Sequence, residues 1–101
     1  MSPVDAFVHR FEPGTAAATL LLLHGTGGDE HQLIDLGHQL APGIALLSPL
    51  GKVMEGGVAA RFFARRAMGD LDLDDLRVRA EELAGWVREA CAVYGRDAGR
   101  L

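Results

Sequence analysis

The stretch "TLLLLHGTGGDEHQL", residues 19–33, places four consecutive leucines before a histidine and a loop that contains three glycines. The apolar run is continuous, which is typical of a strand that is covered on both faces of a parallel sheet. A helical spacing of apolar residues begins after Asp29, a suitable N-cap, and stops at the Pro42-Gly43 pair. The stretch therefore predicts a central strand, a glycine loop and a helix in succession.

The flanking segments fit the same architecture. Residues 5–11 alternate between apolar and polar side chains and predict a peripheral strand, and "IALLSP", residues 44–49, predicts a second apolar strand. Residues 51–70 have no clear period and are expected to form an excursion from the fold. Residues 72–94 carry apolar side chains at helical spacing, which predicts a long amphipathic helix. This order predicts an α/β fold with a mostly parallel sheet and flanking helices.

The composition of the chain argues against several classes of protein. A chain of 101 residues with 49% hydrophobic and 24% charged residues forms one domain at most and is not expected to be disordered. A net charge of −4 argues against a nucleic-acid partner, although Arg61, Arg65 and Arg66 form a small basic patch. The longest apolar run is shorter than the ~20 residues of a membrane span. The N-terminus has no signal-peptide pattern and the single cysteine fits a reducing compartment, so we expect a cytoplasmic protein.

The glycine loop stands where α/β sheets carry their sites, at the carboxyl end of a strand. Glycines let backbone N–H groups point at a ligand, so the loop could bind an anion or stabilise an oxyanion, although such clusters most often only form tight turns. The loop lacks the last glycine of a dinucleotide fingerprint and the Gly-Lys-Ser/Thr of a P-loop. A His-Gly pair at a strand end also precedes an oxyanion N–H in α/β-hydrolases.

Three segments, "LLLLHGTGGDEHQL", "ALLSPLGKVMEGGVAARFF" and "YGRDAGRL", resemble the N-terminal part of the bacterial phospholipase/carboxylesterase family of serine α/β-hydrolases. The resemblance spans nearly the whole chain and implies one partial domain over residues 1–101. It implies that the backbone N–H of Thr26 is an oxyanion donor. The residues that it assigns to the oxyanion loop, 24–29, are His24, Gly25, Gly27 and Gly28. The residues that it assigns to the pocket wall are Met54, Phe62 and Phe63.

The family's nucleophile is expected in a later segment. In relatives a G-x-S-x-G elbow follows the segment that matches "GRDAGRL", and an Asp and a His come later still, whereas this sequence ends at Leu101. Its serines, Ser2 and Ser48, lack flanking glycines, and His24 is expected to have a structural role. We therefore expect a serine hydrolase of carboxylic esters for the longer parent and no activity, and no catalytic residue, in this chain alone. The alternative is a truncated, non-catalytic module that binds a ligand or another chain.

The remaining expectations concern partners and reactive side chains. A small-molecule ester is the implied substrate of the complete protein, with no cofactor and no metal, since the histidines lack the spacing of metal ligands. Cys91 lies in an apolar helix stripe and is expected to be an inert core thiol. The family places a further strand beside residues 19–24. Without that strand we expect an exposed apolar edge through which the chain self-associates.

Overall fold

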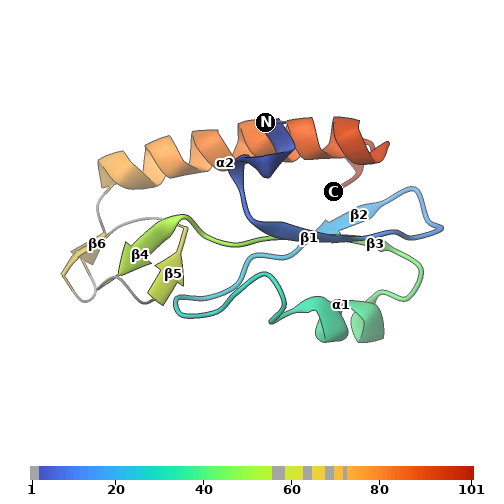
Figure 1. The fold of residues 1–101 in the computed structure, drawn as a ribbon, viewed down its shortest axis with the longest axis horizontal. Coiled ribbons are helices and arrows are strands. Elements are labelled where there is room, and N and C mark those ends of the chain that lie inside the picture. Colours follow the sequence, from blue (N-terminus) through green and yellow to red (C-terminus); the bar gives the residue numbers. More distant parts are fainter. Residues whose placement is uncertain (1–2, 56–58, 63–64, 68–69, 72) are drawn as a thin grey trace.

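The computed structural model describes residues 3–55, 59–62, 65–67, 70–71 and 73–101 of the chain. They form a layered structure in which a small sheet lies between the long helix α2 and the short helix α1 (Figure 1). The elements of these layers are η1 (Pro3–Ala6), β1 (His9–Glu12), β2 (Thr19–Leu21), α1 (Ile34–Leu40), β3 (Ala45–Pro49), α2 (Leu73–Tyr94) and η2 (Ala98–Arg100). The predicted α/β class is confirmed.

Strand β3 is the middle strand of the three-stranded sheet, whose order is β1-β3-β2. Strand β1 pairs with it antiparallel and β2 pairs with it parallel, so the sheet is mixed. The predicted peripheral strand over residues 5–11 is confirmed only from residue 9 onward, because η1 extends to Ala6 and β1 begins at His9. In the described sheet the central position belongs to β3, which is paired on both sides, and β2 lies at the edge, as we expect for residues 19–24 without the family's further strand.

The two faces of the sheet are packed against different helices. Leu47 of β3 belongs to the core on the α2 side, whereas its neighbour Leu46 belongs to the core on the α1 side. In β2, Leu21 packs toward α2 while Leu20 and Leu22 pack toward α1. Consecutive side chains of a strand point to opposite faces, so a continuous apolar run supplies both cores. The predicted coverage on both faces is confirmed.

Helix α1 begins later than the sequence pattern predicts. Residues 30–33 form a turn, and the residue that precedes the helix is Leu33, which makes no side-chain cap. The Asp29 carboxylate instead accepts a hydrogen bond of 2.9 Å from the backbone N–H of His31. Aspartate side chains often bond to the backbone two residues on and so stabilise a turn in place of a helix start. Asp29 therefore caps the turn, and its prediction as the helix N-cap is wrong.

Residues 51–70 contain short antiparallel pairs that their sequence does not reveal. Strand β4 (Val53–Glu55) pairs with β5 (Ala59–Arg61), and β6 (Arg65–Ala67) pairs with β7 (Asp70–Leu71). Strands of two or three residues are too short to show a period of two. Arg61, a member of the basic patch named from the sequence, is only 6% exposed.

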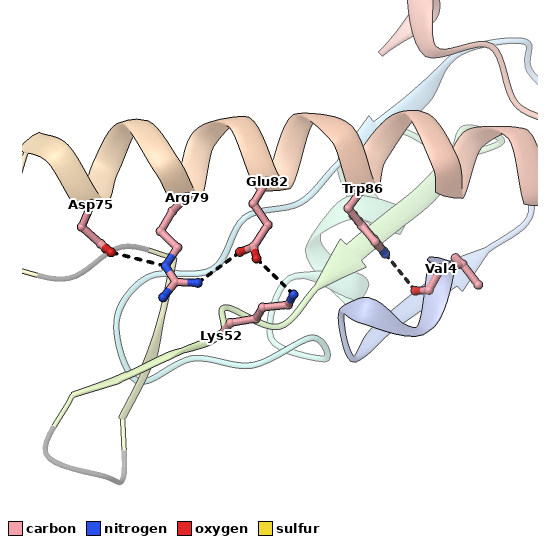
Figure 2. Close-up of polar contacts among 6 residues, drawn as sticks. All are labelled: Val4, Lys52, Asp75, Arg79, Glu82 and Trp86. Carbon is pink, nitrogen blue, oxygen red and sulfur yellow. Dashed lines mark hydrogen bonds and ion pairs between the residues drawn. The ribbon is translucent and has the colours of Figure 1, made fainter. Parts of the chain in front are cut away.

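Helix α2 lies over the sheet and is held by polar contacts at both the start of the chain and the segment after β3 (Figure 2). The Trp86 indole N–H donates a hydrogen bond of 2.8 Å to the carbonyl of Val4. Glu82 pairs with Lys52 at 3.4 Å and with Arg79 at 3.3 Å. None of the described helices is long and apolar enough to cross a membrane.

Arg96 ties the end of α2 to the segment that enters β2. Its Nε donates a hydrogen bond of 2.8 Å to the Thr19 hydroxyl, and its Nη2 donates to the carbonyls of Ala16 and Ala18 at 2.5 and 2.9 Å. Its backbone N–H donates to the carbonyl of Cys91 at 2.7 Å, within the helix end. One side chain therefore joins segments almost eighty residues apart.

Replacing Arg96 by alanine should lower the free energy of unfolding by about 2 kcal/mol, since hydrogen bonds from a charged donor would be lost together. The control is Arg100→Ala, which removes a solvent-exposed pair with Asp97 and should change stability by less than about 0.5 kcal/mol. Denaturant unfolding followed by Trp86 fluorescence measures both. Equal stability of the two variants would show that Arg96 does not hold the sheet to the helix.

Candidate functional site

The loop that follows β2 is held in place by the buried side chain of His24, which is 6% exposed. Its Nδ1 lies 2.7 Å from the carbonyl oxygen of Gly25, and its Nε2 lies 2.9 Å from the backbone nitrogen of Gly51. A carbonyl can only accept and a backbone N–H can only donate, so Nδ1 carries the hydrogen and Nε2 accepts. Both ring nitrogens are occupied, which supports a structural role for His24 rather than that of a base.

Gly51, whose N–H donates to His24, occupies a position where only glycine fits. An alanine Cβ at Gly51 would lie 2.4 Å from the backbone carbon and oxygen of Arg61. No Cβ approaches backbone so closely, so the contact needs a residue without a side chain. Gly51 therefore joins the segment after β3 to the end of β5 and, through its N–H, to His24.

The Gly51→Ala variant should be destabilised by about 3 kcal/mol, because the added methyl group overlaps backbone that cannot rotate away. The control is Gly85→Ala in α2, where the nearest atom to the new Cβ is 4.0 Å away and the removal of a helical glycine should stabilise by about 0.5–1 kcal/mol. Chemical denaturation measures the two changes. A Gly51→Ala variant as stable as the native chain would contradict the close approach.

The backbone of the loop presents N–H groups that have no hydrogen-bond partner among the described residues, and the N–H of Thr26 is one of them. Gly27, with a φ of +85°, donates its N–H to the carbonyl of Ala60 at 2.9 Å, and Gly28 donates to the carbonyl of Gly25 at 2.9 Å. Thr26 is exposed, and within the described part of the chain its N–H has no hydrogen-bond partner. The loop thus fixes the neighbours of Thr26 and leaves this donor available for a ligand.

A cavity of about 210 Å³ lies beside Thr26. The residues that line it are His24, Gly25, Thr26, Arg61 and Phe62. The rings of His24 and Phe62 are in contact, with their centroids 4.7 Å apart. An apolar cavity of about 310 Å³ adjoins it, because both rings also line that second space.

The structure brings together most, but not all, of the residues that the sequence assigns to the site. Phe62 lies at the cavity, whereas Met54 lies on β4 with its side chain 50% exposed, and Phe63 lies outside the described residues. The role of Gly51 and the burial of Arg61 were not among the expectations from the sequence, although a glycine directly after the "LSPL" segment is a signal for close backbone contact.

Other reactive side chains lie away from this cavity or are engaged elsewhere. His31 is an exposed side chain whose Nε2 lies 3.3 Å from Glu30, and His38 lies 3.9 Å from Glu12. Ser48 is buried within β3. Cys91 is 2% exposed in the α2-side core, and its burial raises the pKa of its thiol above the ordinary value. The thiolate is therefore scarce at neutral pH, as an inert core cysteine requires.

Cys91 should react with Ellman's reagent at least about ten times more slowly in the folded chain than in concentrated guanidinium chloride, because both access and the thiolate fraction are reduced. Since the pKa is raised, the rate for the folded chain should still increase as the pH rises above 8. Absorbance of the released thiolate measures it. Equal rates in the two solvents would show that Cys91 is an accessible thiol.

The sheet, its covering helices and the His-Gly loop define a partial α/β fold of the carboxylesterase/hydrolase type. The chain is 44% identical over 93 residues to MhqD, a Bacillus subtilis protein named as a hydrolase, and the match covers 92% of this chain and 46% of that protein. A carboxylesterase of Bacillus cereus is similar in structure, with a TM-score of 0.89 and 38% identity over 94% of this chain and 45% of the other.

A Mesorhizobium loti carboxylesterase is similar as well, with a TM-score of 0.85 and 25% identity over 94% of this chain and 46% of the other. No family model matches the chain. The chain thus spans about half the length of the relatives that it matches. The predicted resemblance to a carboxylesterase-family hydrolase is confirmed over nearly all of the chain.

Proposed function

We propose that this chain supplies the oxyanion loop of a serine hydrolase that acts on small carboxylic esters, in the manner of the phospholipase/carboxylesterase family. The observation that carries the proposal is the N–H of Thr26, which has no partner among the described residues and lies at the edge of the cavity beside His24 and Phe62. The hydrogen bonds of His24 and Gly27 support it, since they hold the backbone on both sides of that donor.

The chemistry follows from the change in charge on the substrate. When a nucleophile attacks an ester carbonyl, its oxygen gains negative charge, and a positioned N–H stabilises that charge more than it stabilises the neutral ester. One such donor contributes about 3 kcal/mol to catalysis. In our proposal Thr26 is this donor, while the nucleophile, the base and a second donor come from the half of the hydrolase that this chain does not match.

The competing function is a non-catalytic module that binds a ligand or another chain. The observation that favours it is the placement of Ser48, which is buried within β3 and has no glycine beside it. The two functions differ in one respect: an enzyme needs this loop joined to a G-x-S-x-G segment, and a binding module does not.

The chain by itself should not hydrolyse p-nitrophenyl acetate above the buffer rate, and a fluorophosphonate probe should leave Ser48 unlabelled, because an oxyanion donor without a nucleophile cannot form an acyl-enzyme. A longer polypeptide that continues this chain with a G-x-S-x-G segment should be active. In it, Thr26→Pro removes the N–H and should lower kcat about 100-fold, whereas Thr26→Ala keeps the N–H and should retain activity.

Trp86 fluorescence checks that both variants of the longer polypeptide are folded. Serine-dependent turnover by the 101-residue chain would contradict the absence of a nucleophile. A folded Thr26→Pro variant with full activity would contradict the role of Thr26.

A further inference from the structure

The cavity beside Thr26 is lined by a buried cationic side chain, that of Arg61. Arg61 is 6% exposed, and among the residues whose burial the structure describes it is the one lysine or arginine that is buried. The other described residues that line this cavity of about 210 Å³ carry no negative charge. A buried guanidinium keeps its charge and is costly to bury unless anionic or polar groups compensate it. Arg61 is therefore the strongest electrostatic feature of the cavity.

Backbone contacts on two sides fix the position of Arg61. On one side, the N–H of Gly27 in the loop donates to the carbonyl of Ala60, the residue before it, at 2.9 Å. On the other side, the backbone of Gly51 approaches that of Arg61 so closely that no side chain fits between them. Within β5, Arg61 lies opposite Val53 of β4. Arg61 is thus held between the loop and the segment after β3 before any ligand binds.

The donors at the cavity outnumber the acceptors. Thr26 contributes a backbone N–H that has no partner among the described residues, and a guanidinium carries five N–H donors in a planar fork. Arg61 also interacts within its own chain, but five donors serve more than one partner. The ring of His24 offers no acceptor, because its Nδ1 carries the hydrogen and its Nε2 accepts from Gly51. Such a cavity favours an anionic ligand.

The size and the apolar wall of the cavity indicate the kind of anion. Its volume of about 210 Å³ is below the roughly 300–1,000 Å³ of pockets for drug-sized ligands, so the ligand is small. Phe62 supplies an apolar surface, with its ring centroid 4.7 Å from that of His24. A carboxylate on a short hydrocarbon chain uses both features, since its two oxygens match a guanidinium fork and its methylene groups pack on an aromatic ring.

We propose that Arg61 binds a carboxylate of the substrate, so that the cavity accepts small esters that carry a second, ionised carboxyl group. This inference rests on the proposed function and names the substrate class for that site. Arg61 determines specificity and takes no part in proton transfer. The carboxylate is charged both before and during the reaction, so Arg61 stabilises the bound substrate and the transition state alike. Its loss therefore raises KM more than it lowers kcat.

The first experiment measures binding to the 101-residue chain by NMR of its backbone amides at neutral pH. Propionate should shift the amide signals of Thr26 and Phe62 in a saturable manner, whereas its neutral analogue propionamide should leave them in place. Arg61→Met removes the charge and should weaken propionate binding about 10-fold or more, and Arg61→Lys should recover part of the loss. The control is Arg100→Ala, an exposed arginine that does not line the cavity, which should leave binding unchanged.

The second experiment uses the longer polypeptide that continues this chain with a G-x-S-x-G segment. Its substrates are monoethyl succinate and ethyl isocaproate, in which an isopropyl group replaces the carboxylate, and ethanol release measures turnover. Arg61→Met should raise the KM for monoethyl succinate about 10-fold or more relative to the KM for ethyl isocaproate. A general loss of structure would affect both esters and would not change this ratio.

Three results would overturn the proposal: equal shifts with propionate and propionamide, propionate binding that a folded Arg61→Met variant retains, or an unchanged ratio of the two KM values. Trp86 fluorescence shows which variants are folded. If Arg61→Met is not folded, the comparison of propionate with propionamide on the native chain and on Arg61→Lys decides.

The two proposals at this site fail separately. Propionate binding that depends on Arg61, in a longer polypeptide without esterase activity, supports the carboxylate site and counts against the proposed function. Hydrolysis of ethyl isocaproate, without propionate binding and without a preference for monoethyl succinate, supports the proposed function and overturns this inference.

Discussion

The complete burial of β3 is the constraint on which the other elements depend. All five of its residues are buried, both of its edges are paired, and its two faces contact different helices. Each large apolar side chain removed from water in this way contributes about 1.5–3 kcal/mol to stability. That is a large share of the net free energy of unfolding for a domain of this size. Strands β1 and β2 take their register from β3, and α1 and α2 are placed by the side chains that β3 and β2 present to them.

The geometry of the candidate site is set by contacts that begin just after the end of β3. Gly51 comes shortly after β3, and its N–H fixes the imidazole of His24, whose other nitrogen fixes the carbonyl of Gly25. Thr26 follows directly, so the direction of its N–H is set by contacts that begin at the end of β3 and pass through the imidazole of His24. A site built from backbone groups and held by a packed strand needs little reorganisation when charge develops on a ligand.

Sequence patterns predicted the parts of the fold that depend on long or continuous runs. The spacing of apolar residues indicated α2, and the two leucine-rich strands were recognisable because each is buried on both faces. The late start of α1 was not predictable. The Asp29 carboxylate accepts a hydrogen bond from the N–H of His31 within a turn and does not cap the helix. The contact of Gly51 with His24, which joins residues 27 positions apart, leaves no local pattern, and neither does the burial of Arg61. The role of Thr26 came from family resemblance and remains a proposal.

The separation of Leu46 and Leu47 onto opposite faces has a consequence for how the sequence can change. The sheet stands between the two cores, so a volume lost at Leu46 is restored by side chains of its own core and not by the aromatic side chains under α2. The side chains of that core are Leu20, Leu22, Leu33 and Ile34. Closely packed interiors transmit changes of a single methylene group to adjacent side chains. Substitutions should therefore compensate one another within each core and accumulate independently across the sheet.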